Sequence, residues 1–289
     1  MNKITITDVR AVPGDSAFLI DDGKTSILYD SGFAFTGFAV ADRIKTYLGS
    51  RSLDYIFLTH SHYDHALGSA YAKVYWPGAK VVAGEYAAKI FAKPSARKVM
   101  RELDRKFAAK CGVTEYEDLI DELAVDIPVK DGDRITAGDM VFTAVELPGH
   151  TRCSVGYYLE SEKLLLASET LGVYDGDKAV VPSFLIGYHT ALDSIAKAKK
   201  LDIREALIPH YGILDQEKTR YYLAEGERSA VETAEAIADI LRHGGSKEQA
   251  LEHFRENFYH GYIKTIYPVD AMELNTTIMI DLIEKELLK

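Results

Sequence analysis

The stretch Leu58-Thr-His-Ser-His-Tyr-Asp-His-Ala-Leu-Gly68 places four side chains that can bind metal within six positions: His60, His62, Asp64 and His65. The run Asp54-Tyr-Ile-Phe-Leu58 before it has the length and β-rich composition of a buried strand. Two histidines separated by one residue, just past a strand end, can turn both imidazoles towards one point. Imidazole together with carboxylate suits zinc, iron or manganese and disfavours magnesium and calcium. The stretch therefore predicts a transition-metal site at a strand end.

Length and composition indicate an ordinary globular protein. The chain has 289 residues, of which 47% are hydrophobic and 27% charged, enough for one large domain or two smaller ones. Its net charge of −10 gives no basic surface for nucleic acid or anionic membrane. We therefore expect a small-molecule substrate, with neither nucleic acid nor membrane as a partner.

The two cysteines, Cys111 and Cys153, form no spacing motif, which favours a reducing compartment over a disulfide framework. The N-terminal residues alternate apolar and polar side chains, which predicts a strand and not a signal peptide. No apolar run approaches the length needed to cross a bilayer. We expect a cytoplasmic protein.

Periodicity predicts a mixed chain of strands and helices up to about residue 214, followed by helices alone. The helical residues 85–121, interrupted at Pro94, are interpreted as an insertion at the edge of the core. The predicted strands are 4–10, 17–21, 25–30, 54–58, 80–83, 154–159, 163–167 and 206–209, with a β pattern through 127–147. The predicted helices are 38–48, a segment from Asp64 to Ala72, 192–201, 217–242, 247–259 and 269–288.

Three more potential ligands follow predicted strands. His150 lies in Leu-Pro-Gly-His-Thr, Glu169 follows the apolar run Leu164–Ala167, and His210 follows Ala206–Pro209. Ligand sites gather at the carboxyl ends of strands in α/β sheets. We therefore expect these three residues to join the four in the first stretch.

This arrangement resembles the metallo-β-lactamase superfamily. The shared features are the His-x-His-x-Asp-His block, a Pro-Gly-His-Thr block, an acidic residue after the next strand and a last histidine at a strand end, in that order over residues 3–214. The resemblance implies an α+β fold, a four-layer αβ/βα sandwich of two mixed sheets with helices outside and metals at one edge. Residues 1–214 would form this metal-binding hydrolase domain, and residues 215–289 a C-terminal helical extension that caps it.

The resemblance also implies a ligand set for two divalent metal ions, with zinc favoured and iron or manganese as alternatives. One ion would be held by His60, His62 and His150, the other by Asp64, His65 and His210, with Glu169 between them. Asp30, in an Asp-Ser-Gly turn, would orient the ligand loop from behind.

Two positions depart from the family pattern. The bridging residue of the family is normally Asp preceded by Gly, whereas here the stretch reads Ala-Ser-Glu-Thr-Leu around Glu169. The extra methylene carries the carboxylate further, so the metal spacing must change or the backbone must shift. Cys153 stands where the family usually has a small residue, and we interpret it as a buried, inert cysteine.

The implied function is dinuclear metal-dependent hydrolysis of a small ester, thioester, lactone or phosphoester by an activated, metal-bound hydroxide. Asp64 could orient the attacking water or accept its proton. His210, or the neighbouring Tyr211, could stabilise the oxyanion that develops on the substrate.

Aromatic residues suggest where a substrate would lie. Candidate pocket residues in predicted site loops are Tyr63, Tyr188, His189 and Tyr211. The helical extension adds Tyr221, Tyr222, Tyr259, Tyr262 and Tyr267, which would line a partly closed pocket if the extension folds over the metal edge and are otherwise packing residues.

Two other functions fit the same residues. One is a non-haem di-iron redox protein acting on oxygen or a sulfur compound, for which an oxygen-rich Glu169 bridge would suit iron. The other is a metal-containing sensor or binding protein, in which the helical extension serves as a homodimer surface or a platform for a partner.

Overall fold

The computed structural model of the chain describes residues 3–289. Its backbone contacts divide the chain into two compact units. Unit 1 comprises the described residues up to Glu146 together with Val155–Glu162, and unit 2 comprises Leu147–Ser154 together with Lys163–Lys289. The predicted boundary at residues 214/215 stays a prediction, because compact units need not coincide with the limits of a family domain.

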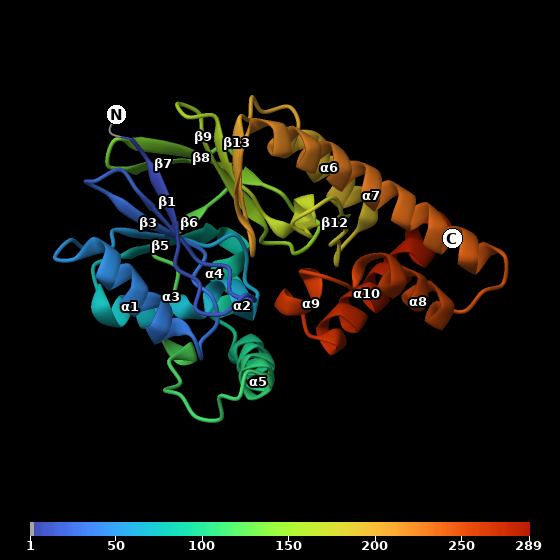
Figure 1. Cartoon of the computed structure of the whole chain (residues 1–289), viewed down its shortest axis with the longest axis horizontal. Helices are drawn as coiled ribbons and strands as arrows, with labels where there is room; N and C mark the ends of the chain where they lie inside the picture. The colour runs from blue at the N-terminus through green and yellow to red at the C-terminus, as the bar shows by residue number, and fades with distance from the viewer. Residues whose placement is uncertain (1–2) are drawn as a thin grey trace. The chain divides into compact units, whose positions relative to one another are not determined.

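Unit 1 contains a six-stranded mixed sheet in the order β1-β2-β3-β4-β5-β6 (Figure 1). Its first three strands pair antiparallel and its last four pair parallel. The strands are β1 (Thr5–Asp8), β2 (Phe18–Asp21), β3 (Ser26–Tyr29), β4 (Tyr55–Phe57), β5 (Lys80–Gly84) and β6 (Ile127–Val129).

Two helices of unit 1, α1 (Gly37–Leu48) and α3 (Gly68–Tyr75), pack against each other. In α1 the buried side chains recur at Val40, Ile44 and Leu48, which is the spacing of one helix face. Because β3 and β4 are parallel neighbours, the segments that follow them lie at the same sheet edge. Those segments begin at Asp30 and Leu58.

The predicted insertion forms α4 (Glu85–Phe91), α5 (Pro94–Lys110) and the short η1 (Ile120–Glu122). Pro94 starts α5, where its missing N–H costs no helical hydrogen bond. The chain of unit 1 then forms three antiparallel strands, β7 (Arg134–Ala137), β8 (Met140–Glu146) and β9 (Val155–Leu159).

Unit 2 contains β10 (Leu164–Leu166) and β13 (Glu205–Ile208), which pair parallel, and β14 (Gly212–Leu214), which pairs antiparallel with β13. After β10 come η2 (Glu169–Leu171), the two-stranded sheet of β11 (Val173–Tyr174) and β12 (Val180–Val181), and helix α6 (Tyr188–Ala198).

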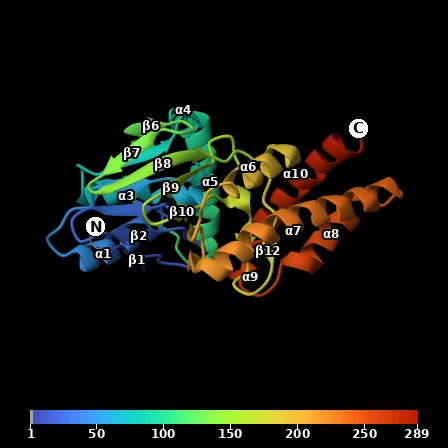
Figure 2. The same ribbon diagram turned by 90° about the horizontal axis from the view of Figure 1, so that it is seen from above.

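The C-terminal helices belong to unit 2. They are α7 (Gln216–Arg242), α8 (Lys247–Phe258), α9 (Ile263–Ile266) and α10 (Val269–Leu287), and Figure 2 shows α7, α8 and α10 together. Asp215 caps α7, and Ser246 with Gln249 forms a capping box on α8. Helix α7 also contacts η2 and β12, so the extension packs on the strands of its own unit.

Several element predictions were wrong in detail. Helix α6 starts at Tyr188 and not at Leu192, because buried Tyr188 and Ala191 add an apolar turn to its start. The helix expected from Asp64 onward is divided into α2 (Tyr63–Ala66) and α3 at Leu67, where Gly68 passes close to the Ser31 backbone. The elements β11, β12, β14 and α9 were not predicted, since two to four residues give no readable periodicity.

Within residues 3–289, no helix has both the length and the apolar character that a membrane crossing requires.

Candidate metal centre

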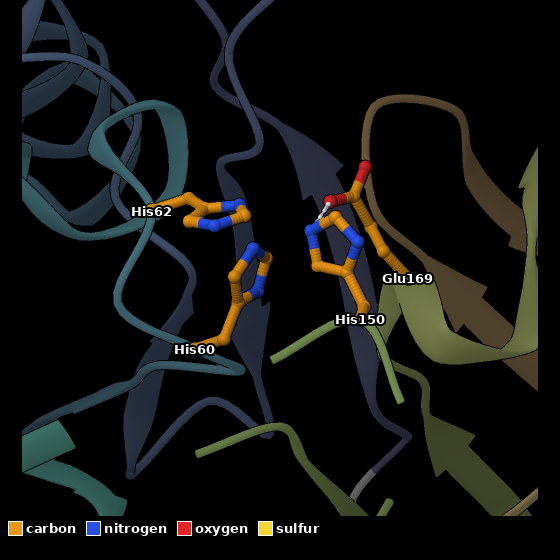
Figure 3. Close-up of side chains that lie close together, drawn as sticks. All are labelled: His60, His62, His150 and Glu169. Carbon is orange, nitrogen blue, oxygen red and sulfur yellow. Dashed lines mark ion pairs between the residues drawn. The ribbon is translucent and has the colours of Figure 1, made fainter. Parts of the chain in front are cut away.

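The first half of the candidate centre is the loop after β4, in unit 1. His60 and His65 are fully buried, and their ring centroids lie 4.0 Å apart. The ring of His62 lies 4.6 Å from that of His60, as Figure 3 illustrates for these two side chains. Asp64 is also buried, with Oδ2 3.6 Å from Nε2 of His65. Three imidazoles and one carboxylate therefore converge within this unit, as the sequence predicts.

Asp30 holds this loop from behind. Its Oδ1 accepts the Thr59 backbone N–H at 2.8 Å, and its Oδ2 lies 2.8 Å from Nδ1 of His65 and accepts the Ser16 hydroxyl at 2.8 Å. Thr59 Oγ1 lies 3.0 Å from Nδ1 of His60. Because hydrogen bonds fix Nδ1 of both histidines, Nε2 is the nitrogen that each would offer to a metal. Asp30 thus occupies the orienting position expected from the sequence.

The second half belongs to unit 2 and begins at His150, which follows Gly149. Gly149 has φ 151°, and a Cβ there would lie 2.5 Å from Thr170 Cγ2 and 2.8 Å from the backbone of Ala191. Only glycine lets the chain pass so close to α6. The His150 backbone N–H donates to Thr170 Oγ1 at 3.1 Å, and its Nδ1 lies 2.8 Å from Ser183 Oγ. Nε2, which faces Glu169, is again the nitrogen that the ring would offer to a metal.

Glu169 lies between the two histidines of unit 2. It is the first residue of η2 and is 2% exposed. Its Oε2 lies 2.9 Å from Nε2 of His150, the ion pair dashed in Figure 3, and its Oε1 lies 3.2 Å from Nε2 of His210. Each carboxylate oxygen therefore contacts one histidine of unit 2. The longer side chain of Glu is compatible with that position.

His210 has a backbone conformation that non-glycine residues rarely adopt. Its φ is 62°, and the Tyr211 N–H donates to the Pro209 carbonyl at 2.8 Å, which closes a γ-turn around His210. This turn directs a fully buried imidazole from the end of β13 towards Glu169. Strain of this kind is characteristic of functional sites.

Two tyrosines of the C-terminal segment contact these ligands. The Tyr267 hydroxyl donates to Glu169 Oε1, and the Tyr262 hydroxyl donates to the His210 carbonyl. Tyr222 of α7 is completely buried and donates to the Gly172 carbonyl at 2.8 Å. Burial, and then the nearby charge of Glu169, raises the pKa of the Tyr222 phenol, which keeps it neutral. The sequence identified these tyrosines as an aromatic group but gave no sign of which one reaches a ligand.

The candidate pocket residues occupy different environments. Tyr188 is buried among apolar side chains, with its ring 5.5 Å from that of Phe184. His189 is exposed, and its backbone N–H donates to Glu286 at 3.1 Å. Tyr211 packs edge-on against Tyr174, and Tyr63 lies 5.6 Å from Phe33. Packing thus accounts for Tyr188, and a substrate role for these four residues stays a prediction.

Cys153 is buried, as predicted, and its sulfur lies 3.2 Å from Thr151 Oγ1. Cys111 is exposed.

The donor chemistry of both halves fits divalent transition metals. Each half combines buried imidazole nitrogens with a carboxylate. In His60, His65 and His150, Nδ1 is already engaged by a neighbouring oxygen. Histidines that bind metal through one ring nitrogen usually have the other held by a neighbouring oxygen, as here. Imidazole and carboxylate donors of this kind suit zinc, iron and manganese.

Comparison with known proteins supports the fold. The family model of the metallo-beta-lactamase superfamily matches residues 12–210. A metallo-beta-lactamase family protein from Thermus thermophilus superposes with a TM-score of 0.64 at 19% identity, over 98% of this chain and 93% of that one. The predicted α+β sandwich, and the helices that follow it, are thereby confirmed.

Two curated relatives share part of the sequence. "Glyoxylase B2" of Dictyostelium discoideum is 30% identical over 128 residues, which is 44% of this chain and 39% of that protein. A "Hydroxyacylglutathione hydrolase" of Nitrobacter winogradskyi is 41% identical over 71 residues, 24% of this chain and 27% of that protein. The chain thus spans less than half the length of these relatives. By the match over residues 12–210, the chain belongs to the metallo-β-lactamase superfamily.

Proposed function

We propose that the two halves of the candidate centre meet to bind two divalent metal ions and that the chain hydrolyses a small carboxylic ester or thioester. In this proposal His60, His62 and His150 hold one ion and Asp64, His65 and His210 hold the other, with the Glu169 carboxylate shared between them. Zinc is the metal we expect.

The observation that carries the proposal is the position of Glu169. One carboxylate oxygen contacts His150, a ligand of the first proposed ion, and the other contacts His210, a ligand of the second. A buried carboxylate is costly unless neighbouring cations share its charge. Two metal ions would supply that charge, and their donors would be the residues already described, which are buried except for the half-buried His62.

Two bound metal ions would supply an activated water molecule and would neutralise charge on the substrate. The residues of the chain have separate tasks. Asp64 orients the attacking water and accepts its proton, and Asp30 fixes His65 and the Thr59 backbone beside it. His210 follows β13 and would hold a metal ion, so the neighbouring Tyr211 is the residue that could donate to the substrate oxygen.

An acyl substrate is favoured over a phosphoester for two reasons. The partial relatives carry the name hydroxyacylglutathione hydrolase, which denotes cleavage of a thioester. The chain is acidic, with net charge −10, and a phosphoester would bring further negative charge.

The test is metal content by elemental mass spectrometry together with a panel of esters, thioesters and phosphoesters. We expect two zinc ions per chain and cleavage of esters or thioesters. Glu169→Asp, which shortens the carboxylate, should lower both metal content and activity. Glu162→Asp, the same change at an exposed position, should alter neither.

A single ion that Glu169→Asp does not affect would contradict the proposed bridge. Two iron ions together with oxygen consumption would replace hydrolysis by the redox function. Full metal content without cleavage of any substrate in the panel would favour a binding protein.

A further inference from the structure

Helix α9 is a single turn of unit 2 with a tyrosine at each end. Tyr262 precedes the turn and Tyr267 follows it. The side chains of Ile263 and Ile266 are buried in the apolar cluster formed with α8 and α10, and both tyrosines pack against the same cluster. Because apolar packing anchors the turn, its two tyrosines have a fixed base from which their hydroxyls can hold other groups.

The Tyr267 hydroxyl contacts a candidate ligand directly, by donating to Oε1 of Glu169. A glutamate side chain has three torsions, so its carboxylate can take several orientations unless the surroundings select one. A carboxylate oxygen has more than one lone pair, so it can accept this hydrogen bond and still bind a cation. Hydrogen bonds of this kind orient the carboxylates that bind metal ions in proteins. Tyr267 can therefore set the direction in which Glu169 presents its oxygens.

The Tyr262 hydroxyl supports the second candidate ligand through the backbone. It donates to the carbonyl of His210, the residue whose positive φ directs its ring towards Glu169. Such a conformation persists only where the surroundings stabilise it, and this hydrogen bond is one of the stabilising contacts. The Tyr267 ring also lies 5.5 Å from the His210 ring. All these residues belong to unit 2, so the contacts do not depend on the position of unit 1.

We propose that Tyr262 and Tyr267 are positioning residues of the metal centre, which prepare His210 and Glu169 to receive metal ions. The C-terminal extension then contributes to metal affinity and is more than a cover for the domain before it. This inference rests on the proposed function only in that metal ions must bind. It depends neither on the substrate nor on the reaction.

The test is a double-mutant cycle on Tyr267 and Glu169, measured as zinc affinity in competition with a chromophoric chelator. Tyr267→Phe keeps the ring and should weaken zinc binding about tenfold, although saturating zinc should still fill the site. Glu169→Asp shortens the side chain and withdraws the carboxylate from the Tyr267 hydroxyl. In that background Tyr267→Phe should therefore have no further effect.

Cobalt(II) gives a second measurement, because its visible absorption depends on the geometry of its ligands. Tyr267→Phe should change the spectrum of the cobalt-loaded protein, whereas a loss of stability alone would leave the spectrum unchanged. Tyr262→Phe should weaken zinc binding through His210. Tyr259→Phe is the matched control, because its hydroxyl donates to the Tyr267 carbonyl at 3.1 Å, in the same segment. It should alter neither the zinc affinity nor the cobalt spectrum.

Unchanged zinc affinity in Tyr262→Phe or Tyr267→Phe, or an equal loss in Tyr259→Phe, would overturn the proposal. So would the same loss from Tyr267→Phe in the Glu169→Asp background. Because no turnover is measured, coupling in a protein that cleaves no ester would support the positioning role and contradict the hydrolase. Ester cleavage without coupling would do the reverse, and a chain that binds no zinc would contradict both.

Discussion

At the scale of single residues, the candidate centre depends on unusual backbone positions and on hydrogen bonds to its ligands. Among the described residues, three that are not glycine have positive φ, and two of them are Asp30 and His210. Each follows a strand: Asp30 contacts His65, a candidate ligand, and His210 is a candidate ligand itself. A positive φ costs local stability, and at both positions it places a side chain of the candidate centre.

The first prediction concerns Asp30. Asp30→Asn exchanges an acceptor oxygen for an amide donor, so the bonds to His65, Thr59 and Ser16 cannot all persist. Loss of such a supporting group should weaken metal binding about 10- to 100-fold. Competition with a chromophoric chelator measures the affinity. Asp139→Asn, at an exposed position, should match the unchanged protein, and equal affinities for all three proteins would contradict the role of Asp30.

The second prediction concerns Tyr267. Tyr267→Phe removes the hydroxyl that donates to Glu169 and keeps the ring that lies beside His210. Since a hydrogen bond to a charged group contributes about 1.5–3 kcal/mol, we expect kcat/KM to fall roughly tenfold or more. Metal content should remain complete. Tyr221→Phe, at an exposed position on α7, is the control, and an equal loss in both variants would show that the effect is not specific to Glu169.

At the scale of elements, α3 is held against the ligand loop by a close backbone approach. A Cβ built on Gly68 would lie 1.8 Å from the Ser31 carbonyl oxygen. Ser31 in turn bonds the His65 carbonyl through its N–H at 2.6 Å and its hydroxyl at 2.8 Å. The first residue of α3 therefore helps to position His65, a candidate metal ligand.

The third prediction follows from this contact. Gly68→Ala should lower the free energy of unfolding by about 1–3 kcal/mol, because the backbone must shift to accept the methyl group. Gly78→Ala is the matched control, since a Cβ there meets nothing within 4 Å. Urea unfolding of both variants gives the comparison. Equal stabilities would mean that α3 can move away from Ser31 without cost.

The fourth prediction concerns the contact between α5 and the loop after β3. Asp104 of α5 accepts the Ala34 N–H at 2.8 Å and the Tyr116 hydroxyl. Burial raises the pKa of Asp104 from 3.8 to about 6, with a small addition from Asp15, whose own pKa burial also raises. The folded chain therefore keeps a proton that the unfolded chain releases between about pH 4 and 6.

The free energy of unfolding should therefore fall as the pH rises from about 4 to 6 and level off above pH 6. Asp104 should contribute no more than about 3 kcal/mol to this fall. Asp104→Asn cannot ionise, so its unfolding free energy should depend less on pH between 4 and 6. Urea midpoints across that range measure the slope. If the pH dependence of unfolding were the same in Asp104→Asn, other groups would cause it, and Asp15 would be the first of these to test.

At the scale of the whole molecule, the sequence was most informative where chemistry is local. Four ligands within six positions identified the loop after β4, and three strand-end residues identified the rest of the candidate set. The contacts of Tyr267 with Glu169 and of Tyr262 with His210 join residues 98 and 52 positions apart. No periodicity or motif encodes such pairs, so the sequence indicated an aromatic group without its contacts. The early start of α6 was missed for a related reason, because burial of Tyr188 depends on helices far along the chain.

We propose that both units contribute ligands to one pair of metal ions. The most direct test is anomalous diffraction from crystals of the zinc-loaded protein, measured on both sides of the zinc absorption edge. We expect two zinc peaks, one bound by His60, His62 and His150 and the other by Asp64, His65 and His210, with a Glu169 oxygen bound to each. A single peak, or two peaks that Glu169 does not join, would contradict it.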